Sequence, residues 1–478
     1  MDTTALRQHL NSVATGVEFC SLRFRRQADE MTTVRQNIVE PIQTTVDEGV
    51  MVTVYDRGGI GYGATSDLSQ QGIAKAFADA KHWAHASAGK SVMNFSDAPR
   101  PSGQRKTSTT VKRPFATLGL GDRVEKLRAL CAGLKKSPSV VDWRTDLWHT
   151  RIDSHFVSTA GAAIDQSFDV LTPMMSVVAN RGSDTQRRTF GGHGFTRQGG
   201  LEILDTLGFW TAGTSVAEEA VQLLDAPNCP SGDLDLILDP AQMILQIHES
   251  IGHPLELDRI LGDERNYAGT SFVTHDMFGS YQYGSKLLNI TFDPFEAGEV
   301  AGYAFDDDGT EAQKEFLIKE GILVRALGGA ISQARAGMSG VANSRATSWN
   351  RPPIDRMANL NLEPGNASLE QLIGKVEKGI IMKTNVSWSI DDSRNKFQFG
   401  CELGQLIENG KLAGVVKNPN YRGISANFWR SLDGVGDRST MEVMGSPFCG
   451  KGEPNQMVFV GHATPAALFR GVAVFGGG

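Results

Sequence analysis

Hydrophobic and polar residues alternate along residues 31–66, and turn sequences interrupt the alternation. The stretch GVMVTVYD is followed by the turn DRGG and then by IGYGATS. A period of two residues with a short glycine-containing turn predicts antiparallel strands joined by a hairpin. Over residues 67–86 the period lengthens, and the apolar positions that recur every three or four residues are Ile73, Phe77, Ala80 and Ala84. This longer period predicts an amphipathic helix that packs on the hairpins.

Two segments of loop-like composition divide the chain into three regions. Residues 98–114 (APRPSGQRKTSTTVKRP) have the composition of a linker, and residues 226–232 (APNCPSG) form a second boundary. We therefore expect an N-terminal α+β region over residues 1–97, a middle region over 115–226 and a C-terminal domain over 232–478.

The middle and C-terminal regions carry fewer but clearer helix signals. We expect one helix over residues 122–137 and another that starts at a capping box formed by Ser215 and Glu218. In the last region the strand DLDLILD is followed by Asp239 as an N-cap and by a proline at the first helical position. The remaining sequence is mostly strand-like, with one helix over residues 368–378. The predicted fold class is α+β with mixed layers of helix and antiparallel sheet, in which the N-terminal hairpin and helix region precedes a large strand-rich C-terminal domain.

The composition is that of an ordinary globular protein. The 478 residues are 40% hydrophobic, and a net charge of -7 without long runs of one sign favours neither nucleic acid nor a membrane surface as a partner. The first residues lack the segments of a signal peptide, and no stretch approaches the roughly 18 apolar residues of a membrane helix. Five scattered cysteines fit a reducing compartment. We therefore expect a cytoplasmic protein.

The candidate chemistry concentrates in HESIGH, residues 248–253, where two histidines bracket a glutamate. His248 and His253 are one position further apart than in the common helical zinc signature. At about 100° per residue, a regular α-helix would point these side chains roughly 140° apart. A π-turn would bring them back to one side, and such turns occur at functional sites. We expect Gly252 to permit this turn and Pro254 to end the helix.

Glu249 lies next to the first histidine, where it cannot share that ligand's direction. In a metal site it would face the metal-bound water, accept a proton and later deliver it to a leaving amine. The alternative is a hydrogen-bonded core feature without a metal, which is the commoner explanation of an arbitrary match to so short a motif. The apolar helix around the motif favours a site, because a charged group there needs a partner.

Two imidazoles leave a catalytic zinc one protein ligand short. Glu256 and Asp258 follow the motif as possible ligands or as hydrogen-bond partners of the imidazoles. Among distant residues Cys449 stands out, because its segment GSPFCGKGEPNQ has the glycines and prolines of a loop. His462 is a further candidate. We expect Cys20, Cys131 and Cys401, in apolar or strand-like surroundings, to be inert small hydrophobic residues.

Three other short motifs favour neither a nucleotide nor a calcium site. GSPFCGKG matches most of a phosphate-binding loop, but Gly452 replaces the hydroxyl residue and a strand follows where a helix is needed. GIGYG, residues 59–63, is better explained by a hairpin than by a dinucleotide fingerprint. The acidic run Asp306-Asp307-Asp308 lacks the spaced ligands of a calcium loop and predicts a turn.

Several segments, in their order along the chain, resemble the TldD/PmbA family of metallopeptidases, and in particular its catalytic TldD-like branch. They are EGVMVTVYDRGGIGYGATSDLS, the HExxxH helix, NLNLEPGNASLEQLIGKVEKGI and GSPFCGKGEPNQMVFVGHATP. The resemblance implies that His248, His253 and Cys449 hold one zinc ion and that Glu249 is the catalytic base. One departure is Pro254, where many relatives have glycine.

The resemblance also implies an activity and a partner. The expected protein is a zinc-dependent metallopeptidase that hydrolyses peptide bonds in short or unfolded polypeptides, peptide precursors included, by a zinc-activated water with Glu249 as general base. Family members act as dimers, so we expect a homodimer or a heterodimer with an inactive PmbA/TldE-like paralogue. Two alternatives stay open: a non-catalytic binding or regulatory subunit of such a complex, and a thiol hydrolase with Cys449 as nucleophile.

Overall fold

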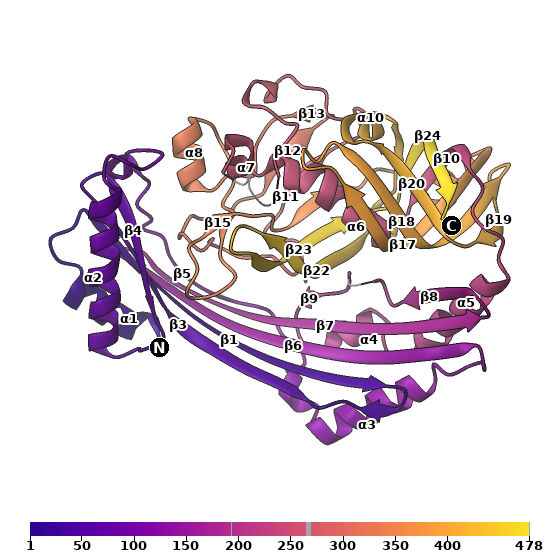
Figure 1. Ribbon diagram of the computed structural model, residues 1–478, viewed down its shortest axis with the longest axis horizontal. Coiled ribbons are helices and arrows are strands. Elements are labelled where there is room, and N and C mark those ends of the chain that lie inside the picture. Colours follow the sequence, from indigo (N-terminus) through magenta and orange to yellow (C-terminus); the bar gives the residue numbers. More distant parts are fainter. Residues whose placement is uncertain (193, 264–268, 478) are drawn as a thin grey trace.

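The computed structural model describes residues 1–192, 194–263 and 269–477. A long, curved sheet extends along the molecule (Figure 1). Its strands are β1 (Phe19–Arg35), β2 (Ile38–Val39), β3 (Gln43–Asp56), β4 (Gly59–Thr65), β5 (Gln104–Ser108), β6 (Val140–Ser158), β7 (Ala163–Arg181), β8 (Asp184–Thr189) and β9 (Arg197–Gln198). The order is β4-β3-β1-β6-β7-β5, with β2 beside β1 and with β8 and β9 beside β7. β5 and β7 are parallel, and the other pairs are antiparallel.

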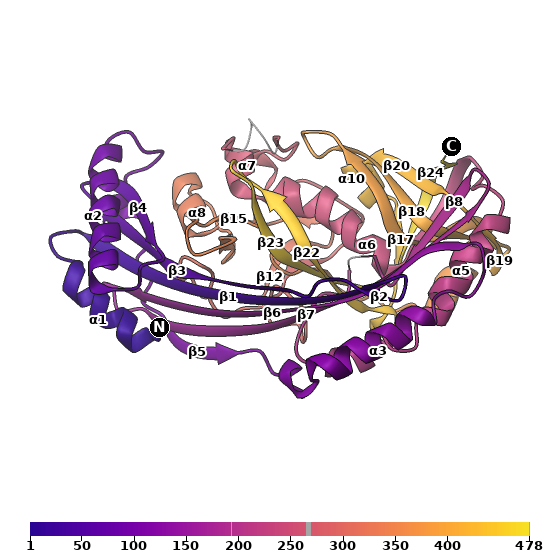
Figure 2. The ribbon, with the colours of Figure 1, turned by 60° about the horizontal axis from the view of Figure 1, so that its bottom comes forward.

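The two faces of this sheet have different partners, because successive side chains of a strand point to opposite sides. Leu22 and Phe24 of β1 pack in one apolar cluster with helices α1 (Thr3–Val13) and α2 (Gln70–Ser87). Further along, helices α3 (Leu120–Ala132), α4 (Glu202–Thr206) and α5 (Gly213–Asp225) form a second cluster with the sheet. Arg23 and Arg25 point the other way, where they donate to backbone carbonyls of the C-terminal half. Figure 2 shows the C-terminal elements on the opposite side of the long strands from α3.

The C-terminal half is built around a second sheet whose strands close into a ring. Its strands are β10 (Gly232–Leu238), β17 (Lys378–Ile390), β18 (Lys396–Glu408), β19 (Lys411–Val416), β20 (Pro419–Ile424), β21 (Leu432–Val435) and β24 (Ala467–Gly476). β10 pairs with β17 on one side and with β24 on the other, and the path from β17 through β18 and β20 returns to β24. β19 and β21 are attached at its edges.

The C-terminal half also contains smaller sheets, hairpins and helices. β11 (Ile290–Phe292), β12 (Glu315–Lys319), β13 (Ile322–Leu323) and β16 (Leu360–Leu362) form one small sheet. β14 (Ser344–Arg345) pairs with β15 (Ile354–Asp355), and β22 (Glu442–Lys451) pairs with β23 (Gln456–Thr464). The helices of this half are α6 (Pro240–Ile247), α7 (Leu257–Leu261), α8 (Ala330–Ala336), α9 (Leu369–Gly374) and α10 (Ser425–Arg430).

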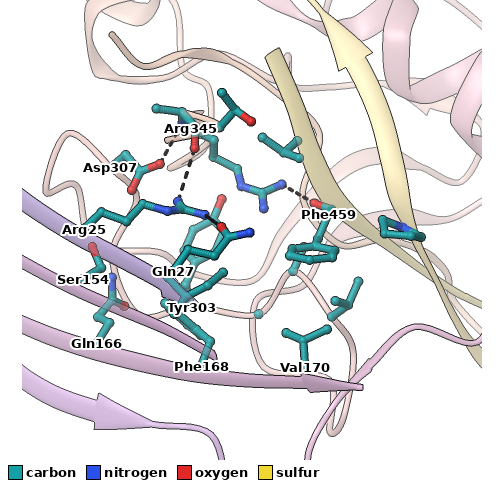
Figure 3. A pocket seen from close by; sticks show the side chains of 18 of the residues that line it. Arg25, Gln27, Ser154, Gln166, Phe168, Val170, Tyr303, Asp307, Arg345 and Phe459 are labelled. Atoms are coloured by element: carbon teal, nitrogen blue, oxygen red, sulfur yellow. Dashed lines mark hydrogen bonds between the residues drawn. The ribbon is translucent and has the colours of Figure 1, made fainter. Parts of the chain in front are cut away.

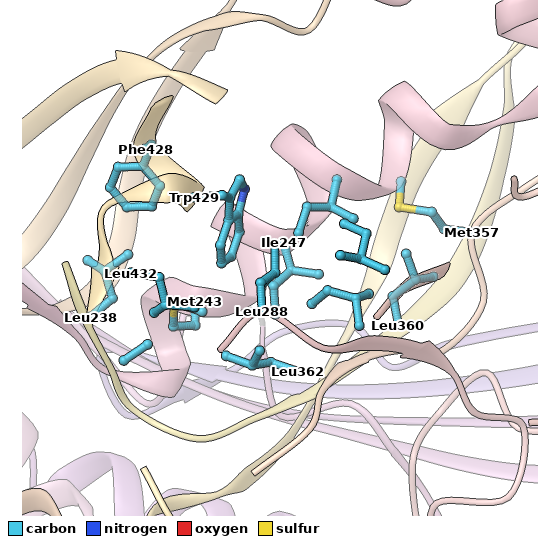
Figure 4. Packing of buried hydrophobic residues seen from close by; sticks show 14 of the residues in the cluster. Leu238, Met243, Ile247, Leu288, Met357, Leu360, Leu362, Phe428, Trp429 and Leu432 are labelled. Carbon is cyan, nitrogen blue, oxygen red and sulfur yellow. The ribbon is translucent and has the colours of Figure 1, made fainter. Parts of the chain in front are cut away.

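Helix α6 is held by the largest apolar cluster of the described residues. Met243 and Ile247 project from it among Leu288, Trp429 and Leu360, all of them fully buried (Figure 4). The Trp429 indole also donates to the Ser250 hydroxyl at 2.9 Å, just beyond the end of the helix. The core thus fixes the direction in which the chain leaves α6.

The predicted α+β class is confirmed, as are the first hairpin and the helix that follows it. Three local predictions are wrong. Within the expected linker, β5 extends the long sheet. The Ser215 hydroxyl donates to the Ala212 carbonyl and forms no capping box, because α5 starts at Gly213. The helix expected over 368–378 ends at Gly374, since β17 begins at Lys378. The division into three regions stays a prediction, and the first two share one sheet.

Truncating a side chain in the cluster around α6 tests this packing. Leu288 is 0% exposed and its neighbour Leu287 is 47% exposed, so the two form a matched pair. We expect Leu288→Ala to destabilise the protein by about 2–5 kcal/mol, because it leaves a cavity beside α6. Leu287→Ala should change the melting temperature little. Thermal unfolding followed by circular dichroism checks both, and equal melting temperatures would contradict this packing.

Candidate metal centre

Helix α6 ends in one widened turn that carries both histidines of the motif. Asp239 caps the helix through its side chain and Pro240 occupies the first turn, as predicted. His248–Gly252 then form a π-turn, in which the His253 N–H donates to the His248 carbonyl. The centroids of the two imidazole rings lie 4.7 Å apart. The predicted π-turn is confirmed, and it brings both side chains to one side of the helix.

Gly252 is needed in this turn for its size, not for its backbone freedom. Its φ of -58° and ψ of -65° are ordinary helical values. A β-carbon there would lie only 1.9 Å from the sulfur of Met357, whose side chain is fully buried. Gly252 thus permits the turn as expected, but through its lack of a side chain and not through backbone freedom. Just beyond, Pro254 lies in a 3₁₀ turn, after which Glu256 is extended, so the helix ends there as predicted.

Cys449 approaches the two histidines from the C-terminal hairpin. It lies in β22 opposite Val458 of β23, directly after a register shift that begins at Ser446. The expectation of a loop is wrong, because the glycines and the proline of GSPFCGK are accommodated within a bulged strand. The ligand atoms of His248, His253 and Cys449 all lie within 4.8 Å of one another. Within the described residues, no other three His, Cys, Asp or Glu side chains form such a group.

One ring nitrogen of each motif histidine bonds a residue behind the ring, and the other nitrogen of His253 faces Cys449. His253 Nδ1 donates to Glu256 Oε2 at 3.0 Å. His462 Nδ1 donates to the Leu360 carbonyl at 3.0 Å, so its bare Nε2 accepts from His248 Nδ1, also at 3.0 Å. Both motif histidines consequently present an unprotonated Nε2. Burial lowers the pKa of all three imidazoles, which favours the neutral form that metal binding needs.

The other candidates for the third ligand lie behind the two histidines. His462 and Glu256 bond the far nitrogens of the rings, which fixes the orientation of both imidazoles. The Asp258 carboxylate contacts neither ring and instead accepts from Lys451 Nζ at 2.6 Å. Glu256 is therefore confirmed as a hydrogen-bond partner of an imidazole, and Asp258 is not.

Cys449 differs electrostatically from the other four cysteines. Arg356 Nη2 donates to its sulfur at 3.0 Å. Burial alone would raise the pKa of this thiol, but Arg356 and His253 bring it below its ordinary value. In the other cysteines burial raises the pKa, to about 12 for Cys20. Cys449 is thus the cysteine that ionises most readily, and the thiolate is the form that binds metal.

A cluster of fully buried charges centred on Glu256 lies behind the candidate ligands. Its Oε2 lies 3.3 Å from Arg259 Nη2 and 3.4 Å from Lys451 Nζ. Burial alone would raise the pKa of Glu256, but Lys451 and His253 hold it well below its usual range. Lys451 belongs to the segment that imitates a phosphate-binding loop. Its ammonium group is committed to Glu256 and Asp258, and it lies in a strand, which agrees with the rejection of a nucleotide site.

Glu249 lies beside the ligands at the edge of a cleft. With His248 it lines a cavity of about 180 Å³, together with Gly191, Gly192, Gly194, Ala241, Ile244, Leu245, Asn385, Trp388, Ser446 and Phe448. Its carboxylate pairs with Arg394 Nη1 at 2.7 Å. Arg394 belongs to the turn between β17 and β18. No sequence signal identifies this arginine, because it lies far from the histidines and in no motif of its own.

A carboxylate beside a compact group of two imidazoles and a thiol is the kind of centre found in metal-dependent hydrolases. Residues 231–476 match the family model described as the PmbA/TldA metallopeptidase C-terminal domain, and residues 20–84 match the model of domain 1. The chain belongs to the PmbA/TldD metallopeptidase family, as the resemblance implied.

Curated relatives of the chain carry metalloprotease names. A metalloprotease of Methanothermobacter thermautotrophicus is 30% identical over 324 residues, which are 68% of this chain and 67% of the relative. The metalloprotease TldD homolog of Buchnera aphidicola is 30% identical over 51% of this chain and 50% of its own length. A zinc metalloprotease TldD homolog of Saccharolobus solfataricus is 28% identical over 46% of this chain and 47% of its own. The matches thus span about half to two-thirds of these relatives.

Solved structures share the fold at low sequence identity. A proposed modulator of a DNA gyrase from Thermotoga maritima has a TM-score of 0.78 and 17% identity, covering 98% of this chain and 99% of that one. TldE from Thermococcus kodakarensis has a TM-score of 0.75 and 16% identity, covering 99% and 100%. Among the described residues, no helix has the length and apolar character needed to cross a membrane.

The contact between Gly252 and Met357 gives a test of the π-turn. We expect Gly252→Ala to cost about 1–3 kcal/mol of stability and to reduce metal binding, because the added methyl group overlaps the Met357 sulfur. Met357→Ala combined with Gly252→Ala should recover metal binding, since the space is vacated. Gly121 has open space around it, so Gly121→Ala is the neutral control. Melting temperature and metal content report the outcome; a fully stable, metal-binding Gly252→Ala would contradict it.

Proposed function

We propose that this chain is a zinc-dependent peptidase in which His248, His253 and Cys449 hold the metal and Glu249 is the general base. The observation that carries the proposal is the convergence of two neutral imidazoles and a readily ionised thiol from distant segments. Two nitrogens and one sulfur leave the fourth position of a tetrahedral zinc open, as in catalytic sites. The family description and the relative named a zinc metalloprotease support this choice of metal and reaction.

Zinc in this site would lower the pKa of water and polarise a peptide carbonyl. Glu249 takes a proton from the attacking water and returns it to the departing nitrogen. Its position supports this role, because it lies on the same turn as the two histidines and lines the cleft. Arg394 is a positioning residue: its ion pair holds the Glu249 carboxylate in a fixed orientation until substrate enters.

The cleft suits an extended peptide. Gly191, Gly192 and Gly194 on its wall let the main chain of a ligand approach closely, and Trp388 and Phe448 offer apolar surface. The substrates are short or unfolded polypeptides, peptide precursors included. The active unit is a dimer, either of two copies or with an inactive paralogue of the TldE kind, which the shared fold of TldE supports. Five free, buried cysteines support the cytoplasm as its compartment.

The thiol-hydrolase alternative is weaker. Cys449 is 1% exposed, and its sulfur lies against Arg356, so a substrate carbonyl has poor access to it. A peptidase of that kind would also be indifferent to chelators. A non-catalytic subunit would not require the ion pair of Glu249 and Arg394 at the cleft. The cleavage assay below distinguishes such a subunit from a peptidase.

Metal content tests the ligand set. We expect about one zinc per chain in wild type and in Glu249→Gln, and strong loss in Cys449→Ala, because the site then lacks its thiolate. Cys401 is a buried cysteine away from the centre, so Cys401→Ala should keep its zinc. Plasma mass spectrometry on protein purified with zinc present measures all four. Zinc retained in Cys449→Ala would move the third ligand to His462 or Glu256, and a metal-free wild type would end the proposal.

Cleavage of a denatured protein tests the roles of the two charged residues. Glu249→Gln should lower kcat by about 10²–10⁴-fold at unchanged zinc content, because it cannot accept a proton. Arg394→Gln should lower kcat less and leave KM nearly unchanged, whereas Arg394→Lys should restore part of the lost kcat, because it keeps the positive charge beside Glu249. Removal of zinc by a chelator should abolish cleavage and its return restore it. Cleavage that resists chelation would favour the thiol hydrolase, and binding without cleavage by wild type would favour the regulatory subunit.

A further inference from the structure

A second cavity lies between the long sheet and the C-terminal half. It has a volume of about 240 Å³, and Figure 3 shows its lining. Strands β1, β6 and β7 contribute one wall, because Arg25, Ser154 and Gln166 are register partners on one face of the sheet. The opposite wall comes from β14, from the hairpin of β22 and β23, and from residues 300–307. Neither the candidate ligands nor Glu249 lines this cavity.

Two guanidinium groups in this cavity donate only to neutral acceptors within the described residues. Arg25 donates to the Ala346 carbonyl and to the Gln27 side chain at 3.3 and 3.2 Å. Its buried Nε has no hydrogen-bond partner there. Arg345 donates to the carbonyls of Met357 and Phe459 at 2.6 and 2.7 Å. Both side chains are half-buried, and a partly desolvated cation that bonds no carboxylate favours a bound anion.

The carboxylates in the same cavity are already engaged. Asp307 Oδ2 accepts the Ala346 N–H at 2.7 Å and lies 3.9 Å from Arg23 Nη1. The Asp306 carboxylate accepts three backbone N–H groups at 2.9 to 3.1 Å. Burial lowers the pKa of both cavity arginines, although Asp307 partly offsets this for each of them. Among the described residues, Arg25 and Arg345 nevertheless form no hydrogen bond with a carboxylate.

Much of the remaining lining is apolar or aromatic, beside polar side chains such as Gln166 and Thr347. The aromatic side chains are Trp148, Phe168, Tyr303, Phe305, Phe448 and Phe459. An apolar body that ends in one carboxylate matches such a cavity, since the body is removed from water and the carboxylate meets the guanidinium groups. A bare inorganic anion would leave the aromatic wall unused.

One residue joins this cavity to the cleft at Glu249. Phe448 lines both cavities. Of the residues just before it, Ser446 lines the cleft and Pro447 lines the second cavity. A peptide that crosses Phe448 in extended form, at about 3.3 Å per residue, reaches the second cavity within a few residues of the scissile bond. We propose that this cavity is a specificity subsite that binds a carboxylate-bearing residue of the peptide through Arg25 and Arg345. The proposal rests on the proposed peptidase function.

Equilibrium binding of short peptides tests the subsite without turnover. The background is Glu249→Gln, and the probes are fluorescent alanine hexapeptides that end in phenylalanine, with either a free C-terminal carboxylate or an amide. A third peptide is amidated and carries glutamate in place of the phenylalanine. We expect the free carboxylate to bind about ten- to a hundredfold more tightly than the amide. A glutamate peptide that binds as tightly as the free acid would identify a side-chain carboxylate as a source; weak binding would restrict the subsite to the C-terminus.

Two substitutions on β1 link the preference to Arg25. Arg25→Gln should remove it, and Gln27→Glu should weaken it as well, because a resident carboxylate then meets the guanidinium at the Gln27 position. Arg26 points to the other face of the sheet and pairs with Glu48, so Arg26→Gln should keep the preference. Gln27→Glu hardly alters the size of the side chain. If Arg25→Gln proves unstable, Gln27→Glu alone is therefore sufficient for the test.

Failure of the subsite and failure of the peptidase give different results. Equal affinity for acid and amide, or a preference that survives both Arg25→Gln and Gln27→Glu, would overturn the subsite while wild-type cleavage still stands. A clear acid preference in protein that neither holds zinc nor cleaves would keep the carboxylate site but remove its link to proteolysis.

Discussion

Two imidazoles five positions apart converge only if the helix gains a residue in the turn between them, and the rest of the centre follows from that turn. The hydrogen bond from the His253 N–H to the His248 carbonyl spans five residues, one more than in an α-helix. Packing keeps the turn in place, because Gly252 admits the Met357 side chain and Trp429 bonds the Ser250 hydroxyl. Once the rings face the same side, one hairpin is enough to bring a thiol to them.

Buried charge connects that hairpin to the helix. Cys449 and Lys451 lie two positions apart on β22 and therefore point to the same side of the strand. The first approaches the imidazoles, and the second reaches Glu256 and Asp258 directly after the motif. Because an unpaired buried ammonium or carboxylate costs several kcal/mol, the strand has little freedom to shift relative to the helix. These buried charges thus set the position of the thiol.

Local patterns predicted those parts of the molecule that local physics determines. The first hairpin and the capped start of α6 depend on residues adjacent in sequence, and the sequence predicts both. The spacing of the histidines also predicts the π-turn, although the distant residues Met357 and Trp429 keep it in place. Arg394, Arg356 and the strand character around Cys449 depend on contacts between distant segments, which no spacing reports. The same holds for β5: its polar sequence is typical of a linker, but the free edge of β7 provides hydrogen bonds for its backbone. The ligand roles themselves came from the family resemblance as much as from the motif.

The partners of the polar face of strand β1 can be identified only in the folded molecule. Alternation along FCSLRFRR places Leu22 and Phe24 under the helices and Arg23 and Arg25 on the other face. The arginines on that second face would predict exposure to solvent, but the C-terminal half covers it. A charged side chain kept under such a cover needs either a resident partner or a ligand. Arg23 has Asp307 and two carbonyl groups. Arg25 donates only to neutral acceptors and lines a cavity that shares Phe448 with the cleft, so the same face of the sheet both supports the fold and offers a polar site.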